Sequence, residues 1–416
     1  MNKNANLWQR LSDFASGIRL DSISVGPFGL SFGSVRPSTP AFTEILQHVN
    51  PLEGCPAVLV VSAQNVDEVT VVDRIDPNHE CEALRSSIKV CGGSGANTAF
   101  ALSRLGLGTT IAGIVGDDAD GRMLARELVA SGVNTSLLLT GTELPTGRTT
   151  TLVEEGGQRL IVVHPGINDR YAARVDSSRL IEVGHASKIV HVSSFVGQAE
   201  LALQQKLVSA VGSHSVVSLT PGAIYARQGL DRLRELLRHV DVIFLYREQL
   251  VTLIENSSAS GVKAGDRPID YLNAFFEWRR RSGLTSPIVV VVKDPLEVGA
   301  GKMHQKFLSV AVGRDQVDYY IAPQELPKGL QLRVVDTTGA GDAVAAGFLF
   351  GIFRQAPLEA CLDFAFLLAA YSSTELGART AFMGYATDLR GRSRQIEAGE
   401  HRSLGPQLLE GELHEE

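Results

Sequence analysis

The feature that most constrains the fold of this chain is the alternation of short, continuous apolar runs with segments of helical periodicity. The apolar runs lie at residues 57–61, 110–116, 189–192, 216–219, 242–245 and 288–292. The helical segments lie at about 122–129, 199–211, 229–239, 247–255, 269–282, 347–353 and 358–373. Continuous apolar runs are typical of strands buried on both faces, and strands that alternate with helices form parallel sheets. The sequence therefore predicts an α/β fold, with a doubly wound, mostly parallel sheet and helices on both faces.

Residues 146–164 have a different pattern, which is that of a β-hairpin: residues 149–153 and 160–163 flank a turn at 155–158.

The two ends of the chain also differ from the middle. Residues 1–55 form an extension with a stretch rich in Gly, Ser and Pro and one short amphipathic helix, predicted from Leu7, Trp8, Leu11 and Phe14. This extension either packs on the main domain, which we favour, or binds a partner. Residues 56–388 are the predicted domain, and the polar residues 389–416 are predicted to be a disordered tail.

Composition excludes several classes of protein. The net charge is −7 and the sequence pI is about 5.9, which argues against nucleic acid as a partner. The four cysteines contain no Cys-x-x-Cys pair, so neither a zinc site nor a disulfide framework is expected, and a reducing cytoplasm fits best. The start of the chain lacks an apolar signal-peptide core, and the longest apolar run, 343–353, is too short to cross a bilayer. We therefore expect a cytoplasmic protein with no membrane partner.

One glycine-rich stretch, residues 336–342, joins an apolar strand to an Ala-rich helix. The first turn of a helix has N–H groups without internal partners and carries partial positive charge. Glycines on either side of Ala340 allow the backbone to approach an anion closely. We expect an anion-binding turn, with Asp342 placed beside it as a base; the alternative is that Asp342 only caps the helix. The residues of the turn are Thr338, Gly339, Ala340 and Gly341.

A second glycine-rich stretch, residues 91–106, opens another helix and carries Gly93 and Asn97. It is not a dinucleotide-binding fingerprint, because the last glycine of that pattern would fall at Thr98. Upstream, Asn65 and Asp67 follow the first buried strand. Ligands gather at the carboxyl ends of strands in open α/β sheets, so these two residues are candidates for holding substrate hydroxyl groups. The equally weighted alternative is a turn with Asx hydrogen bonds.

With both stretches considered, the chain resembles the ribokinase-like (PfkB) family of carbohydrate kinases. The first signature runs from Gly92-Gly93-Ser94-Gly95-Ala96-Asn97 to Gly121, and the second, more specific one is residues 336–343. Weaker similarity extends over about 57–385. The resemblance implies a small β-sheet lid, with strands within about 67–90 and 146–165, over a doubly wound core. It also implies transfer of a phosphoryl group from ATP to an alcohol with Mg²⁺, and it allows a homodimer formed through the lid.

The resemblance assigns roles to individual residues. Asp342 would take the proton of the attacking hydroxyl group, and the N–H groups of residues 339–342 would form the anion hole. Asp67, Gly93 and Asn97 would hold the substrate, and Asp336 and Thr338 would bind a monovalent cation such as K⁺. Phosphoryl transfer depends mainly on positioning and electrostatics. The chain has no Gly-x-x-x-x-Gly-Lys-Ser/Thr loop, so the turn at 339–341 must hold the phosphate.

The chain departs from the family pattern in three places. The family commonly has an Asn-x-x-Glu element linked to magnesium, and the matching residues 246–249 keep neither side chain, so the Mg²⁺ site is unassigned. Lys293-Asp294 follows the strand that usually precedes a glycine-bearing nucleotide loop, and Phe366 stands where Asn is frequent. The leading hypothesis is an ATP-dependent kinase of a sugar or sugar-like alcohol. The alternatives are a nucleoside kinase of the same fold and a catalytically weak relative with a ligand-binding or regulatory role.

Overall fold

The computed structural model describes residues 39–49, 57–76, 79–154, 159–258, 267–294, 298–299, 302–303, 308–321, 336–375, 377–383, 385–387 and 393–395. The helix predicted near Leu7 and most of the predicted tail lie outside these residues. Within the tail segment, Ser393–Gln395 (β17) pairs antiparallel with Tyr385–Thr387 (β16). Among the described residues, no helix is both long enough and apolar enough to cross a membrane.

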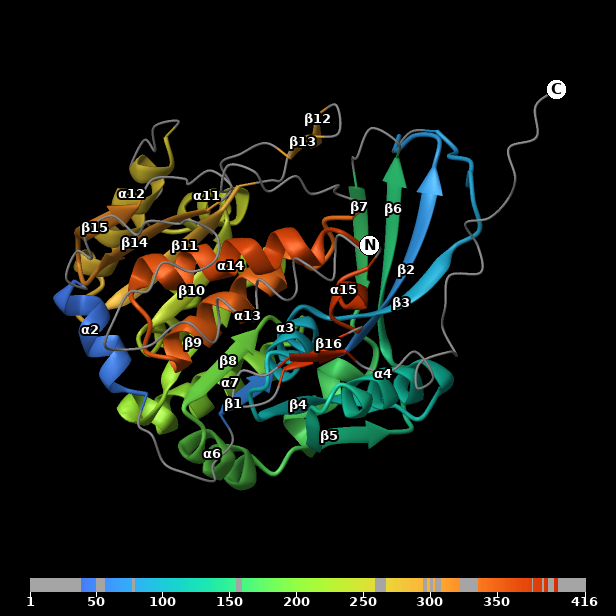
Figure 1. Cartoon of the computed structure of the whole chain (residues 1–416), viewed down its shortest axis with the longest axis horizontal. Helices are drawn as coiled ribbons and strands as arrows, with labels where there is room; N and C mark the ends of the chain where they lie inside the picture. Colours follow the sequence, from blue (N-terminus) through green and yellow to red (C-terminus); the bar gives the residue numbers. More distant parts are fainter. Residues whose placement is uncertain are drawn as a thin grey trace.

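The centre of the molecule is a nine-stranded sheet in the order β15-β14-β11-β10-β9-β8-β1-β4-β5 (Figure 1). The seven strands from β11 to β5 are parallel, and β14 and β15 extend one edge antiparallel. This confirms the predicted doubly wound, mostly parallel sheet. The strands are β1 (Val58–Val61), β4 (Thr109–Gly116), β5 (Asn134–Gly141), β8 (Ile189–Ser193), β9 (Val216–Thr220), β10 (Val242–Tyr246), β11 (Ile288–Lys293), β14 (Leu308–Gly313) and β15 (Val317–Ile321).

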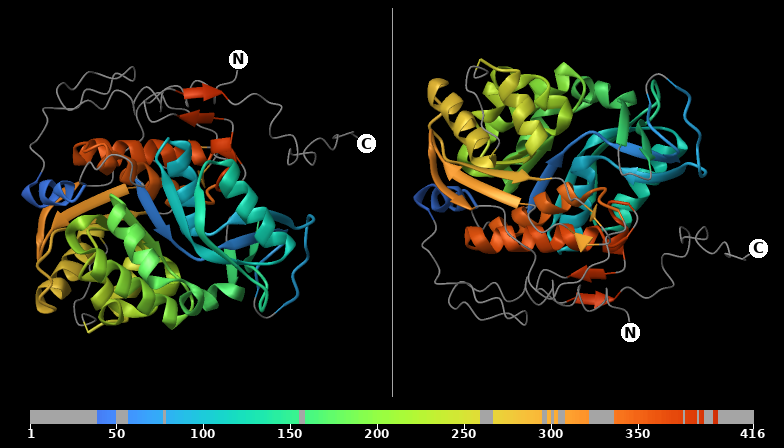
Figure 2. Two further views of the ribbon diagram at one scale, coloured as in Figure 1. Left: turned by 90° about the horizontal axis from the view of Figure 1, so that it is seen from below. Right: turned by 90° about the horizontal axis from the view of Figure 1, so that it is seen from above.

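Helices cover both faces of this sheet, as Figure 2 shows. The alternation of side chains along each strand divides the core: Val58 and Val60 belong to one apolar cluster, and Leu59 and Val61 to the other. One face carries α2 (Pro40–Gln47), α3 (Ser94–Arg104), α13 (Ala340–Phe353) and α14 (Leu358–Ser372). The other carries α6 (Ser177–Ala186), α7 (Gln198–Val211), α8 (Gly222–Ala226), α9 (Gly229–Arg232), α10 (Arg234–Leu237), α11 (Arg247–Glu255) and α12 (Pro268–Arg281).

A smaller four-stranded sheet stands beside the main sheet (Figure 1). Its order is β3-β2-β6-β7, in which β2 and β6 are parallel and the two outer pairs are antiparallel. The pairing of β6 with β7 confirms the predicted hairpin. The strands are β2 (Asn65–Val72), β3 (Ile88–Gly92), β6 (Gly147–Glu154) and β7 (Arg159–His164). The remaining elements are α4 (Ala119–Ala130), η1 (Gly166–Arg170), α5 (Tyr171–Arg174), η2 (Gly212–His214), α15 (Thr380–Met383), β12 (Val298–Gly299) and β13 (Lys302–Met303).

Some boundaries differ from the prediction. α4 begins at Ala119 rather than near 122, because the carboxylate of Asp118 accepts a hydrogen bond from the N–H of Gly121 at 2.7 Å and caps the helix there. The single helix expected at 229–239 is two short helices, α9 and α10, which meet at Leu233. The strands β5, β14 and β15 were not predicted. β5 and β15 are the two edge strands of the sheet and are only partly buried, so their apolar pattern is weaker, whereas β14 is buried throughout but its apolar run is interrupted by Ser309.

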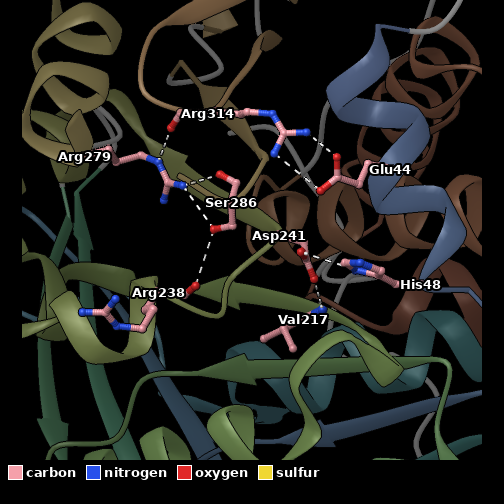
Figure 3. Close-up of polar contacts among 8 residues, drawn as sticks. All are labelled: Glu44, His48, Val217, Arg238, Asp241, Arg279, Ser286 and Arg314. Atoms are coloured by element: carbon pink, nitrogen blue, oxygen red, sulfur yellow. Dashed lines mark hydrogen bonds and ion pairs between the residues drawn. The ribbon is translucent and has the colours of Figure 1, made fainter. Parts of the chain in front are cut away.

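The described part of the N-terminal extension packs on the domain. In α2, Phe42 and Ile45 are fully buried in the core cluster that α13 and α14 also line. Polar contacts hold the same helix at the edge of the sheet: Glu44 pairs with Arg314, and His48 lies 3.7 Å from Asp241 (Figure 3). Burial raises the pKa of Asp241, and the nearby imidazole of His48 opposes this rise. α2 is therefore part of the folded domain, in agreement with the packing that we favoured.

Candidate active site

The turn before α13 is built around the carboxylate of Asp336. Its Oδ1 accepts hydrogen bonds from the main-chain N–H of Thr338 at 2.9 Å and from its hydroxyl group at 2.7 Å. Its Oδ2 accepts a bond from the N–H of Gly377 at 2.9 Å. Gly339 has φ of 77°, and a β-carbon there would lie 2.3 Å from that of Ala378. Only glycine fits this position, so the turn and the segment at 377–378 form one packed unit.

The first turn of α13 has the tight geometry of a helix start. The N–H of Ala340 donates to the carbonyl of Thr337 at 3.2 Å, and the N–H of Asp342 donates to that of Gly339 at 3.0 Å. The underside of the turn is packed, because a β-carbon at Gly341 would lie 2.8 Å from the hydroxyl of Tyr246. The positive end of this 14-residue helix therefore lies where the sequence predicted the anion hole.

Asp342 joins the two glycine-rich stretches. Its carboxylate accepts hydrogen bonds from the hydroxyl group of Ser94 at 2.7 Å and from Nδ2 of Asn97 at 2.8 Å. Both donors lie on α3, and no side chain caps α13, which argues against the capping alternative. Burial raises the pKa of Asp342, while these two hydrogen bonds and the charges of Lys293 and Arg379 oppose the rise. A buried carboxylate held in this way is suited to accept a proton.

Arg379, which the sequence did not single out, fixes the orientation of Asn97. Its side chain is 2% exposed and donates through Nε to Oδ1 of Asn97 at 2.8 Å. It also bonds to Glu127 at 2.9 Å and to the carbonyl of Gly92 at 2.7 Å. Because Oδ1 of Asn97 is occupied by the guanidinium group, Nδ2 faces Asp342. A lone arginine in a polar segment carries no recognisable sequence signal, so only the fold reveals this role.

Asp67, on β2, lies near Arg379 and Asp342. Its Oδ1 accepts a hydrogen bond from the hydroxyl of Thr149 at 2.6 Å, and its Oδ2 would lie 2.0 Å from a β-carbon at Gly92. Gly92 is therefore required for the carboxylate to occupy its position. Burial raises the pKa of Asp67; Thr149 and Arg379 oppose this, and the negative charge of Asp342 adds to it. The ionisation of Asp67 therefore depends on the charge of Asp342.

Asn65 lies two positions before Asp67 on the same strand, so both side chains are on one face of β2. Its Oδ1 accepts a hydrogen bond from Nδ2 of Asn168 at 3.1 Å. The fully buried Asn168 also binds both the N–H and the carbonyl of Gln64, at 2.8 and 3.0 Å, and so fixes the segment between β1 and β2. Gly93, the N-cap of α3, packs against this segment, because a β-carbon there would lie 2.9 Å from the carbonyl oxygen of Ala63.

Lys293 at the end of β11 lies directly beneath the glycine-rich turn before α13. Its Nζ is 3.4 Å from the carbonyl oxygen of Gly341 and 4.5 Å from the centre of the Tyr246 ring. The side chain is 1% exposed. Burial lowers the pKa of Lys293 to about 8, and the negative charge of Asp342 opposes this shift. From the sequence alone, this lysine was recognisable only as a departure from the family pattern.

The residues at 246–249 have structural roles. The side chain of Gln249 accepts a hydrogen bond from the N–H of Tyr246 at 3.0 Å and so caps α11. Arg247 forms an ion pair with Asp294 across the ends of β10 and β11. Among the described residues, no group of three or more His, Cys, Asp or Glu side chains is placed to hold a metal ion.

The geometry defines a class of enzyme. A glycine-rich turn at a helix start lies beside a buried carboxylate and a set of polar side chains from a separate small sheet. This arrangement suits a phosphotransferase that acts on an alcohol group. The model of the pfkB family of carbohydrate kinases matches residues 58–270 and 304–383, and the chain belongs to this family.

Known relatives agree with this assignment. An uncharacterized sugar kinase of Archaeoglobus fulgidus is 29% identical over 284 residues, which cover 67% of this chain and 96% of that protein. An ATP-dependent ribose-1-phosphate kinase of Halopiger xanaduensis is 29% identical over 332 residues, covering 78% of this chain and 95% of the relative. The structure of Arabidopsis thaliana ribokinase complexed with ribose and ATP has a TM-score of 0.61 and 23% identity, covering 79% of this chain and 95% of that one. This likeness shows the fold. The chain is a phosphotransferase of the pfkB family of carbohydrate kinases, with an alcohol group as acceptor.

Proposed function

We propose that this protein transfers the γ-phosphoryl group of ATP to a hydroxyl group of a sugar or sugar-like molecule, with Asp342 as the general base. The observation that carries the proposal is the position of the Asp342 carboxylate. It lies at the start of α13 and is held by Ser94 and Asn97 of α3 at 2.7 and 2.8 Å. The base thus lies between the anion-binding turn and the residues proposed to hold the substrate.

Each group has a defined part in this proposal. Asn65, Asp67, Gly93 and Asn97 hold the substrate, and Asp342 takes the proton of the attacking hydroxyl group. The oxygen of that hydroxyl bonds to the γ-phosphorus as the bond from this phosphorus to the oxygen of the leaving ADP breaks. The N–H groups of Gly339 and Gly341, at the positive end of α13, stabilise the negative charge of the phosphoryl group, and Thr338 and Ala340 shape the turn through their own hydrogen bonds. When bound, ATP supplies that group and Mg²⁺ neutralises part of its charge.

Different arguments support the two proposed cations, Mg²⁺ and K⁺. Mg²⁺ commonly retains its waters and binds substrate phosphates with only one or two carboxylates, so it would be held here mainly through the nucleotide. We propose K⁺ near Asp336 and Thr338, whose side-chain oxygens lie 2.7 Å apart. Turnover that rises with KCl but not with an equal concentration of tetramethylammonium chloride would support this site.

The test of the proposed reaction is ADP release with a panel of sugars and nucleosides, for the wild type and Asp342→Asn. The asparagine has the same shape and is expected to reduce turnover at least ~10²-fold, because one general base contributes roughly that much or more. Melting curves control for folding of the variant. Equal turnover of both proteins on every substrate that reacts, or the absence of ADP release by the wild type across the panel, would contradict the proposal.

Two alternative functions can be distinguished from the proposed sugar kinase activity. A nucleoside kinase of the same fold would release ADP with nucleosides and not with sugars in the same panel. A ligand-binding role without turnover is favoured by one observation, the use of Gln249 as a helix cap where the family element linked to magnesium is expected. Melting temperatures that rise with nucleotide, without ADP release, would identify this second alternative.

We also propose a homodimer formed through the small sheet. β7 is its edge strand, and Leu160, Ile161, Val162 and Val163 are 36–55% exposed along it. An edge strand with consecutive exposed apolar side chains is an unusual surface for a monomer. Sedimentation of the wild type as a dimer, and of Ile161→Lys as a monomer, would support the proposal; a monomeric wild type at micromolar concentration would contradict it.

A further inference from the structure

The buried amine of Lys293 has no partner that accounts for its charge. Its side chain is 1% exposed, and its acceptor among the described residues is the carbonyl oxygen of Gly341 at a long 3.4 Å. No carboxylate of the described chain lies within ion-pair distance of Nζ; the other contact is the face of the Tyr246 ring at 4.5 Å. A buried ammonium group is costly unless something opposite compensates it. The compensation must come from beyond its direct contacts.

The negative charge that acts on Lys293 is that of Asp342, the proposed base. Lys293 ends β11 beneath the first turn of α13, where Gly341 leaves room for it: a β-carbon there would lie 2.9 Å from Nζ. Asp342 is the next residue along that turn. Burial lowers the pKa of Lys293, and the charge of Asp342 raises it; the same lysine lowers the pKa of the carboxyl group. The two groups therefore interact through the buried turn.

The other charged groups around Asp342 do not replace this lysine. Arg379 approaches from the segment before α15, but it is already paired with Glu127 at 2.9 Å. Asp67 on β2 is negative and disfavours a second negative charge nearby. Ser94 and Asn97 of α3 are neutral donors. On the side of Lys293, burial lowers the pKa of His191 to about 3, so this histidine stays neutral near pH 7.

We infer that Lys293 is a positioning residue for the base: its ammonium group, held by the Tyr246 ring, keeps the carboxylate of Asp342 ionised at neutral pH. Burial favours the neutral acid, which cannot accept a proton from the substrate, and a nearby positive charge in a low-dielectric region reverses that preference. The ring of Tyr246 stabilises the cation without neutralising it. This inference rests on the proposed role of Asp342 as the base. Tyr246 and Lys293, which both depart from the family pattern, then act together on the ionisation of Asp342.

The test compares Lys293→Met and Lys293→Gln with the wild type in the pH dependence of kcat/KM. Both variants remove the charge, and glutamine can still donate to the carbonyl of Gly341. The acid limb should move to higher pH by on the order of 1 unit in both variants, as expected for the loss of a nearby opposite charge. Restoration of the wild-type limb by glutamine, or an unchanged limb in both variants, would overturn the inference. Lys188→Met is the matched control, because Lys188 also lies over an aromatic ring, 5.0 Å from the centre of Phe353, but at the opposite end of α13 from Asp342.

A second measurement does not depend on turnover. In protein labelled with ¹³C at aspartate carboxyl groups, the resonance of Asp342 is identified by its loss in Asp342→Asn. Its midpoint of titration should rise by on the order of 1 unit in the Lys293 variants and stay unchanged in Lys188→Met. An unchanged midpoint would overturn the inference even if the enzyme is active. Conversely, a raised midpoint in a protein that releases no ADP would support the inference about charge and contradict only the proposed reaction.

Discussion

Arg379 donates through Nε to Oδ1 of Asn97 at 2.8 Å, and this bond decides which end of the Asn97 amide meets Asp342. With its oxygen occupied, the amide presents Nδ2 to the carboxylate at 2.8 Å. An asparagine free to rotate would offer its donor and its acceptor equally. The guanidinium group therefore fixes a hydrogen bond that it does not itself make, between two residues that lie 245 positions apart in the chain.

Replacing Arg379 should lower the stability of the folded protein. Arg379→Met leaves Glu127 and Oδ1 of Asn97 without their donor, and breaking a buried charged pair in this way costs roughly 3–5 kcal/mol. Arg379→Lys keeps the charge but cannot form three directed bonds to Asn97, Glu127 and Gly92, so it should restore only part of the stability. Urea denaturation measures the free energy of unfolding. A loss below about 1 kcal/mol for Arg379→Met would contradict the prediction.

Gly92→Ala should weaken substrate binding by displacing Asp67. The added β-carbon would lie 2.0 Å from Oδ2 of Asp67, so the carboxylate must leave its position. Loss of a hydrogen bond from a charged group costs roughly 1.5–3 kcal/mol, which corresponds to a rise in KM for the sugar of about tenfold or more. Gly108→Ala is the control, because the nearest atom to its β-carbon would be the nitrogen of Ala57 at 3.8 Å. Equal KM values for the two variants would contradict the assignment of Asp67.

The burial of Lys293 should make stability depend on pH above neutrality. Its pKa falls from the ordinary 10.5 to about 8 in the folded protein, so between these values the unfolded chain binds more protons. Stability should therefore rise with pH in this window, and below about pH 8 the full penalty remains. At 1.36 kcal/mol per unit, the difference between the wild type and Lys293→Met should change by about 3 kcal/mol from pH 8 to 10.5. A difference in unfolding free energy that is flat over this range would contradict the prediction.

The N-terminal helix should be required for stability. Phe42 on α2 is fully buried in the core, and truncation of a buried phenylalanine costs roughly 3–5 kcal/mol. Phe42→Ala should therefore lower the melting temperature clearly. Thr43 is exposed on the same helix, so Thr43→Ala should change the unfolding free energy by less than about 0.5 kcal/mol. Equal stability of the two variants would show that α2 is dispensable for the fold.

The main architecture could be predicted because buried parallel strands leave a strong local signal. Runs such as 57–61 and 288–292 are apolar throughout, since both faces of each strand are covered. β15 could not be found in this way: it lies at the edge of the sheet, and its side chains from Val317 to Ile321 are only partly buried. α9 and α10 appeared as one helix, because the break at Leu233 involves no glycine or proline that would mark it.

The sequence by itself determined the strands and helices, the two glycine-rich turns and Asp342 as the candidate base. These features depend on residues close together in the chain, whose spacing reflects backbone geometry. Only the tertiary structure decided the environment of that base. Arg379, Lys293 and Asn168 were not predicted as site residues, because their roles come from contacts across 48 to 287 positions of the chain. Burial and electrostatic interactions depend on distance in space, so a carboxylate's environment emerges only when the chain is folded.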